Sequence, residues 1–433
     1  MSDKIKWKRA RLIPVVGTKR DREAEQRATS AFLAVLSIVR DFSKELLAPM
    51  GASSAEKATV DTYTEVSMDE VRPDGVIRVT WGKRSFTGLV EVKTGTNKLD
   101  KDQVKAYIKS ARKAKYDHVL TISNEIASAG AHPIQGLGVQ TNSLVQVSHL
   151  SWVLILSTAL RLKNHKGVDD PEQAWILEEL VRYLQHDASG VLSFGDMGRS
   201  WLAIRDNART VSLSRRTEGL KDVAQKLDEL HEFAALQLST EIGCDVTVIH
   251  PKALKEDQPQ RIESLVKAMI DGNPIRGQFR IPNTAGDIVS EIDLRARQMT
   301  VSIEVKAPAD KGALGRINWI LRQLGSAPEN AVLEAYRKKA QIPNYAKLGS
   351  IRDDKRRSVL LGEERSEPHR FVVKMRARME PGRKASGHKP GFVDGYMGLL
   401  FQFYEEVVQN LTAWQPPAPK RKATVVEADE ATE

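Results

Sequence analysis

Two strand-like runs joined by a short polar turn stand in the first quarter of the chain. The runs are Val76 to Trp81 and Thr87 to Lys93, with Gly82-Lys83-Arg84 between them. This pattern predicts a β-hairpin. A turn centred near Gly82 to Lys83 places Asp74 beside Val92 and its neighbours Glu91 and Lys93. Glu91 and Lys93 share a face because side chains alternate along a strand. We therefore expect two carboxylates and one ammonium group at the same end of a sheet.

Such a group of side chains suits the metal-dependent hydrolysis of a phosphodiester. Mg²⁺ prefers hard oxygen ligands, keeps several waters and polarises a bound phosphate. A lysine adds positive charge near the attacking water. The alternative interpretation is a half-exposed hairpin with alternating charges. The Pro73-Asp74-Gly75 sequence before one strand and the apolar residues around Glu91 in the next favour the hydrolytic site.

The flanking segments predict the order helix, three strands, helix, strand. We expect a helix over Asp21 to Leu47, strands over Thr62 to Val66, Val76 to Trp81 and Thr87 to Lys93, a helix from Asp100 to about Lys115, a strand over His118 to Ile122, and a further candidate strand over Gln146 to Leu150. In the first helix, Glu25 lies within about 20° of Phe32 on the apolar face, and Glu45 lies on the far side. A carboxylate among core residues is costly unless it is paired or metal-bound, so Glu25 is the better candidate acid.

These motifs resemble the PD-(D/E)xK nuclease superfamily, which carries Pro-Asp on one strand and Glu-x-Lys on the next. Gln103 and Tyr107 on the following helix resemble the Gln-x-x-x-Tyr element of its RecB-like and phage-exonuclease-type branch. The resemblance covers roughly residues 21–160 and implies a central mixed sheet flanked by helices.

The resemblance also implies roles for individual residues. The implied catalytic residues are Asp74, Glu91, Lys93, Gln103 and Tyr107, and the implied metal ligands are Glu25, Asp74, Glu91 and the carbonyl of Val92. Lys93 is the expected catalytic lysine, and Gln103 and Tyr107 are expected to support the site and touch DNA. The expected cofactor is Mg²⁺, with Mn²⁺ as its substitute.

The whole chain has 433 residues, too many for one ordinary core, and is expected to be a mixed α/β protein. We divide it into a basic N-terminal arm (1–20), the nuclease-like domain (21–160), a helical linker or insert (161–241), a second α/β domain (242–414) and a disordered tail (415–433). No apolar run is long enough for a membrane span, and one cysteine, Cys244, excludes an intrachain disulfide. These features favour a cytoplasmic protein, and association with the nucleoid is compatible with them.

The tripeptide Glu-Val-Lys occurs a second time, at Glu304-Val305-Lys306, inside an apolar run that a helix and a strand follow. A hairpin turn near residues 297–298 places Glu304 opposite Glu291. No Pro-Asp precedes this hairpin, and Arg316 and Ile320 stand at the offsets of Gln103 and Tyr107. We expect a degenerate copy, with Glu291, Glu304 and Lys306 as a candidate second site.

Most of the net charge of +10 lies in one window. Residues 331–390 hold 16 Lys and Arg against 7 Asp and Glu, a balance of +9. The candidate nucleic-acid-binding residues are Arg337, Lys338, Lys339, Lys355, Arg356, Arg357, Arg383 and Lys384. The alternative is a solvated surface around a core.

Together these features predict an Mg²⁺-dependent DNA nuclease of the restriction, phage-defence or DNA-repair type, with a C-terminal domain that grips the nucleic acid. The alternative is a non-catalytic DNA-binding or scaffold protein on a nuclease-like fold, such as a stress-response or repair accessory. The expected partner is DNA. RNA as partner and homo-oligomerisation are left open, and no membrane partner is expected.

Overall fold

The computed structural model describes residues 8–9, 20–68, 71–128, 131–137, 143–186, 189–210, 212–255, 257–338, 342–352, 354–361 and 367–416. Most of the expected N-terminal arm and of the expected C-terminal tail therefore lies outside the described residues. The chain forms two compact units. The first comprises Met1–Pro282, Ile288–Thr300 and Ala377–Phe401, and the second comprises Asn283–Asp287, Val301–Arg376 and Gln402–Glu433.

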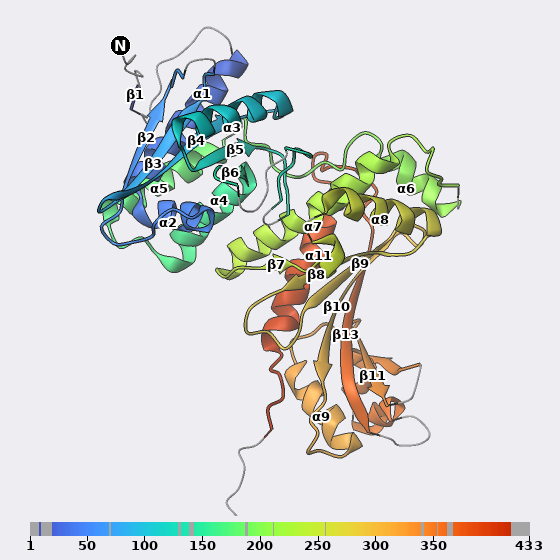
Figure 1. Cartoon of the computed structure of the whole chain (residues 1–433). Helices are drawn as coiled ribbons and strands as arrows, with labels where there is room; N and C mark the ends of the chain where they lie inside the picture. Colours follow the sequence, from blue (N-terminus) through green and yellow to red (C-terminus); the bar gives the residue numbers. More distant parts are fainter. Residues whose placement is uncertain are drawn as a thin grey trace, which may run out of the picture. The chain divides into compact units, whose positions relative to one another are not determined.

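The first unit contains a six-stranded mixed sheet, which confirms the α/β class (Figure 1). Its strands, in the order in which they lie side by side, are β1 (Lys8–Arg9), β2 (Thr59–Thr64), β3 (Gly75–Trp81), β4 (Arg84–Val92), β5 (His118–Ser123) and β6 (Gln146–Ser151). The pairs from β1 to β4 are antiparallel, whereas β4, β5 and β6 run parallel. The expected hairpin is β3–β4, and the strand expected at Thr62 to Val66 begins three residues earlier.

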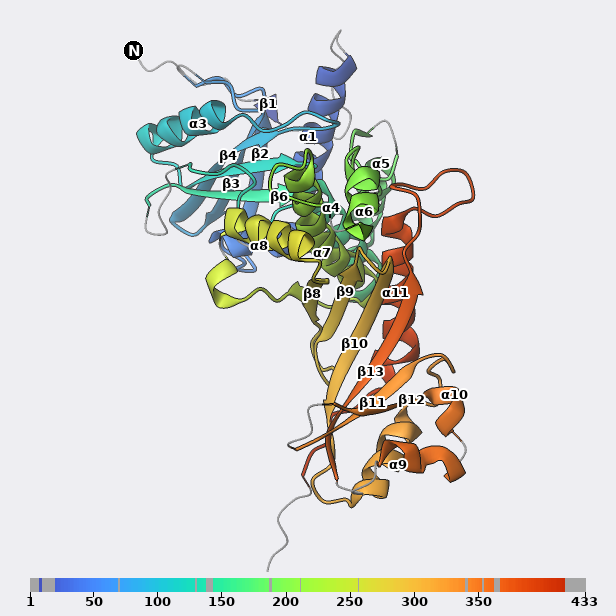
Figure 2. The ribbon, with the colours of Figure 1, turned by 90° about the vertical axis from the view of Figure 1, so that its right-hand side faces the viewer.

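Helices cover both faces of this sheet. The helices α1 (Arg20–Ile38), α2 (Arg40–Leu47), α4 (Trp152–Arg161) and α5 (Pro171–Leu184) pack on one face, and α3 (Lys101–Ala114) packs on the other (Figure 2). Alternating strand residues divide between the two cores: Ile77 and Val90 face the first group of helices, whereas Val76 and Leu89 face α3. The β4 strand is therefore buried on both faces.

The helix expected over Asp21 to Leu47 is in fact two helices, because the backbone of Val39 is extended (φ −90°, ψ 102°). The amide of Arg40 donates a hydrogen bond to Gln173 Oε1 (3.0 Å). The break keeps both Val39 and Phe42 fully buried.

The described residues between 151 and 241 are mostly helical, as expected. After α4 come a π-helical turn η2 (Leu162–Lys166), α5, α6 (Trp201–Arg209) and α7 (Leu220–Ile242). Asp170 caps α5 by accepting hydrogen bonds from the amides of Glu172 and Gln173, with Pro171 in the first turn. Leu177 and Leu180 of α5 belong to the same core as α1. In the described residues, no helix is long and apolar enough to cross a membrane.

A seven-stranded sheet follows in sequence, with strand order β12-β11-β13-β10-β9-β8-β7. Its strands are β7 (Thr247–Val248), β8 (Ile275–Arg280), β9 (Ile288–Asp293), β10 (Gln298–Lys306), β11 (Val332–Arg337), β12 (Asn344–Lys347) and β13 (Pro368–Arg378). The associated helices are α8 (Gln258–Asp271), α9 (Ala313–Gln323), α10 (Leu348–Ile351) and α11 (Phe392–Glu406), and the short 3-10 helices are η1 (Ala48–Met50), η4 (Lys252–Leu254), η5 (Asp354–Leu360) and η6 (Val408–Asn410). In this sheet β13 lies between β10 and β11, whereas β4 and β5 are adjacent in the first sheet.

Candidate active site

The β3–β4 hairpin places Asp74 at the end of β4. Gly75 pairs with Val90 and Trp81 with Arg84, so opposed residue numbers sum to 165. The expected register is therefore off by one residue, and Asp74 comes opposite Glu91 instead of Val92. Asp74 Oδ2 still accepts a hydrogen bond from the Val92 amide (2.8 Å), which fixes its carboxylate beside the strand end.

Lys93 joins the acidic side chains. Its Nζ donates to Glu91 Oε1 (2.6 Å), to the Val92 carbonyl (3.2 Å) and to Glu25 Oε1 on α1 (3.4 Å). The Lys93 backbone is held on both sides, because its amide donates to the Ile122 carbonyl (2.8 Å) and its carbonyl accepts from Trp152 Nε1 (2.9 Å). The ammonium group thus has a defined position between carboxylates from two elements.

Burial and neighbouring charges shift the pKa values of these groups. Burial and the nearby negative charge of Glu91 raise the pKa of Asp74 to about 8. Burial also raises the pKa of Glu25. For Lys93, burial works to lower the pKa, but the hydrogen bond to Glu91 and the charges of the three carboxylates outweigh it and the pKa is raised. Glu91 is only 1% exposed, and its Oε2 atom has no hydrogen-bond partner. Three carboxyl groups and one ammonium group therefore share this strand end, and burial opposes the ionisation of two of the acids.

The helix α3 supports the loop before β3. Asp100 caps the helix by accepting from the Gln103 amide (2.7 Å). Gln103 Nε2 donates to Tyr107 Oη (2.8 Å), and Tyr107 Oη donates to the carbonyl of Arg72 (3.1 Å), two residues before Asp74. Burial and the negative charge of Glu91 raise the pKa of Tyr107 well above its usual value, so its hydroxyl stays protonated. The Gln-x-x-x-Tyr pair thus holds the Pro-Asp segment in place.

The oxygen atoms of the site fit a hard divalent cation in part. Asp74, Glu91 and the Val92 carbonyl lie at one strand end, and the unpartnered Glu91 Oε2 is a free donor atom for a metal. Glu25 reaches the site through Lys93. Within the described residues, no three His, Cys, Asp or Glu side chains converge as a metal-holding group. Two carboxylates and one carbonyl are therefore the candidate ligands at the strand end, and Glu25, which contacts the same Lys93 ammonium group, stays a predicted further ligand.

A polar row beside Glu91 was not expected from the sequence. Glu91 pairs with Thr121 on β5, which pairs with His149 on β6. Thr121 Oγ1 lies 3.0 Å from His149 Nδ1 and 2.8 Å from His132 Nε2. Burial lowers the pKa of His149 to about 3 and of His132 to about 4, so the row is neutral at pH 7. In the sequence this row is marked by a polar residue at each matching position of β4, β5 and β6. Trp152, which donates to the Lys93 carbonyl, also belongs to the site, and no pattern in the sequence indicated it.

The second Glu-Val-Lys sequence has different surroundings. Glu304 and Lys306 are exposed on β10, and Glu304 forms an ion pair with Arg370. Glu291 instead pairs with Arg276 across β8 and β9 (3.3 Å). Neither Glu291 nor Glu304 is therefore a buried carboxylate at a strand end, as Glu91 is.

The expected nucleic-acid-binding residues fall into several environments. Lys339 and the side chain of Lys355 lie outside the described residues. Arg337 donates to the Leu361 carbonyl (2.7 Å) and Arg357 to Asn318 Oδ1 (3.0 Å). Arg383 lies 3.5 Å from Asp196. The exposed members of the set are Lys338, Arg356 and Lys384. Residues 331–376 of the window belong to the second unit and residues 377–390 to the first, so the window is not one structural element.

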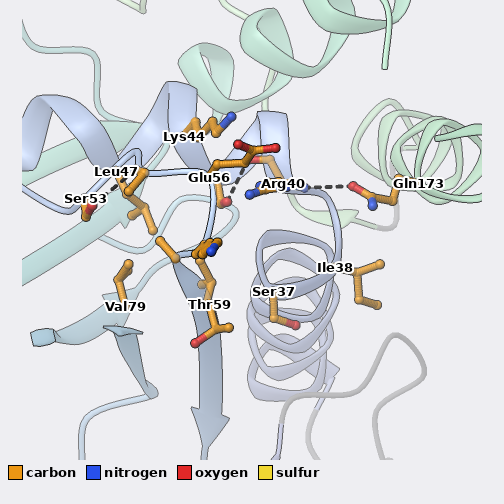
Figure 3. Close-up of a pocket in the computed structure, with 15 residues that line it drawn as sticks. Ser37, Ile38, Arg40, Lys44, Leu47, Ser53, Glu56, Thr59, Val79 and Gln173 are labelled. Carbon is orange, nitrogen blue, oxygen red and sulfur yellow. Dashed lines mark hydrogen bonds between the residues drawn. The ribbon is translucent and has the colours of Figure 1, made fainter. Parts of the chain in front are cut away.

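A surface cavity of about 380 Å³ lies between α1, α2 and β2 (Figure 3). Ser37, Arg40, Lys44 and Thr59 are among the residues that line it. None of the expected site residues lines this cavity, so it is not the candidate active site.

Comparisons of the chain with protein-family models, with curated proteins and with solved structures found no match.

Proposed function

We propose that the chain is a metal-dependent DNA nuclease with a PD-(D/E)xK-like core in its first unit. The observation that carries the proposal is the group at the end of β4, where Lys93 Nζ lies 2.6 Å from a buried Glu91 and the Val92 amide holds Asp74. A fully buried carboxyl group and a half-buried one beside a lysine are costly for a purely structural hairpin. The order of helices and strands around it supports the same proposal, because α3 connects β4 to the parallel strand β5.

Each residue has a distinct role in this proposal. Asp74, Glu91 and the Val92 carbonyl would hold Mg²⁺, which supplies charge for a bound phosphate and a more acidic water. Lys93 places its ammonium group beside the same carboxylates and stabilises negative charge that develops on the phosphate. Tyr107 keeps the Asp74 loop in position through the Arg72 carbonyl.

The chain offers an internal control for the test. Lys93→Met removes the ammonium group of the Glu-Val-Lys sequence at the end of β4, and Lys57→Met makes the same change at an exposed position of the same unit. We expect Mg²⁺-dependent cleavage of circular, linear, single-stranded or structured DNA by the wild type and by Lys57→Met. The Lys93→Met protein should lose at least a hundredfold in rate, as removal of a charge-stabilising group typically does.

Near-ultraviolet circular dichroism checks that Lys93→Met is folded. Equal cleavage by folded Lys93→Met and wild-type protein would overturn the site assignment. Salt-sensitive DNA binding without cleavage in Mg²⁺ or Mn²⁺ would favour a non-catalytic binding protein instead.

A further inference from the structure

The second unit presents a polar face of its sheet. Along β10, Val301, Ile303 and Val305 are at most 1% exposed, whereas the alternate residues Glu304 and Lys306 are exposed. Backbone hydrogen bonds from Ala307 to His369 and from Met379 to Arg297 show that β13 runs antiparallel to β10. The strands β13, β11 and β12 follow β10 side by side in the same sheet (Figure 2), so a face defined on β10 continues across four strands.

We define the polar face by the residues that the argument uses: Lys306, Tyr336, Tyr345, Arg370, Lys374 and Arg376. Tyr345 pairs with Glu334, and Tyr336, two residues further along β11, pairs with Arg370 of β13. Residues that pair across neighbouring strands, and residues two apart on one strand, point to the same side of a sheet. These side chains therefore share one side.

Positive charge predominates on the polar face. Its two acids are already engaged, because Glu304 pairs with Arg370 and Glu334 with Lys374 (2.8 Å). Lys306 and Arg376 are exposed and have no ion-pair partner among the described residues. The charges on the polar face that are not paired are therefore positive, as binding of a polyanion requires.

Two tyrosines stand among these cations. The guanidinium group of Arg370 lies over the Tyr336 ring, 3.9 Å from its centroid. Tyr345 is 67% exposed on the edge strand β12. An exposed ring on a sheet is a surface on which an unpaired base can stack, and a paired base in a duplex does not offer its face in this way.

We infer that the polar face binds single-stranded DNA, with bases stacked on Tyr345 and phosphates at Lys306 and Arg376. Two strands separate β12 from β10, so a bound strand would cross about 14 Å of sheet between the tyrosine and the lysine. The choice of DNA rests on the proposed nuclease function. The stacking and charge argument concerns the second unit alone.

Fluorescence anisotropy of the full chain with a labelled mixed-sequence 20-mer, in EDTA to prevent cleavage, tests this inference. Tyr345→Ala should weaken binding of single-stranded DNA about tenfold, because stacking on one aromatic ring is typically worth that much. Tyr345→Phe keeps the ring and should bind like the wild type. Trp175→Ala, which removes an aromatic residue that is 59% exposed on α5, is the matched control and should have no effect.

The salt dependence tests the cations. Lys306→Met combined with Arg376→Met should reduce the slope of log K against log salt by about 1.4, at about 0.7 for each lost phosphate contact with a single strand. Lys57→Met combined with Lys252→Met removes two exposed lysines of the first unit and should leave the slope unchanged.

Three results would overturn the inference: unchanged affinity of Tyr345→Ala, an equal loss for duplex and single-stranded DNA, or preferred binding of a matched RNA strand. Cleavage is scored separately in Mg²⁺. Binding that depends on Tyr345 without any cleavage refutes the proposed function and supports the polar face. Cleavage with unchanged binding by Tyr345→Ala refutes the polar face alone.

Discussion

The substitution Asp74→Asn should stabilise the protein in the absence of divalent ions. The pKa of Asp74 is raised from 3.8 to about 8 in the folded chain, chiefly by burial. At pH 7 the Asp74 carboxyl group is ionised in the unfolded chain but mostly protonated in the folded chain. Taking up this proton on folding costs at most about 4 kcal/mol at pH 7, because the unfolded pKa is 3.8. Water reaches this partly exposed side chain, and we expect about 2 kcal/mol instead.

The sign of the pH dependence follows from the same shift. A group whose pKa is raised on folding costs nothing below its unfolded value and costs progressively more as pH rises through the folded value. The advantage of Asp74→Asn should therefore be absent near pH 4 and should grow up to about pH 8. Asparagine Oδ1 can still accept the hydrogen bond from the Val92 amide, so packing is preserved.

Thermal unfolding in EDTA at pH 5, 6, 7 and 8 measures this effect. A gain of about 2 kcal/mol corresponds to a rise in Tm of roughly 3 °C for a unit of about 320 residues, because the entropy of unfolding is about 2.1 cal/mol/K per residue. Asp169→Asn, at an exposed loop position, is the control and should show no such trend. A Tm of Asp74→Asn at or below that of the wild type at pH 8 would refute the reasoning.

Added Mg²⁺ should reverse the order of the two proteins. An ion that binds only the folded state stabilises it by about 2.7 kcal/mol at a hundred times its Kd. The wild type should gain this stability, whereas Asp74→Asn lacks the charged ligand and should gain little. Equal gains in both proteins would show that Asp74 does not bind the ion.

Two further predictions concern buried groups of the first unit. Arg261→Met should destabilise the protein by about 3–5 kcal/mol in urea unfolding, because it leaves the buried Asp228 without its partner. Asp228 lies 3.0 Å from Arg261 Nε and is only 3% exposed. Adding Asp228→Asn should recover much of the lost stability, and no recovery would contradict an electrostatic cause. Burial lowers the pKa of His231 to about 4, so between pH 6.5 and 4 only the unfolded chain takes up the proton. The free energy of unfolding should therefore fall by up to about 3 kcal/mol as the pH drops through this range. The fall should be shallower for His231→Gln, and an equal slope would contradict the role of His231.

Local signals in the sequence were sufficient for the elements that carry the site. The hairpin, the cap at Asp100 and the strand β5 depend on residue type and short-range spacing, and the structure contains all three. The contact between Glu25 and Lys93 joins residues 68 positions apart. Helical periodicity placed Glu25 on the buried face but could not identify its partner.

Other features depend on packing that no local pattern encodes. Val39 continues the apolar face of the first helix, yet its backbone is extended. The next amide, that of Arg40, donates a hydrogen bond to Gln173, which lies 133 residues further along the chain. The turn lies at Gly82 and Lys83, where it was expected, but opposed residue numbers were expected to sum to about 166 and they sum to 165. The structure has Trp81 paired directly with Arg84.

The two Glu-Val-Lys sequences show a distinction that the sequence does contain. Phe86 to Val92 is a nearly continuous apolar run, which is typical of a strand buried on both faces. Thr300 to Lys306 alternates polar and apolar residues, which is typical of a strand with one exposed face. The structure buries Glu91 and exposes Glu304 accordingly.

The core under the candidate site is built from one continuous stretch, from Ala28 to Leu184. During synthesis on the ribosome this stretch emerges well before β13, which ends at Arg378, 194 residues later (378 − 184). At about 5–20 residues per second, translation of that interval takes roughly 10–40 s. A nascent chain would thus contain every residue of the core beneath Asp74, Glu91 and Lys93 before the sheet that carries Tyr345 is complete, so under the proposed function the cutting site would be synthesised ahead of the surface that holds the strand.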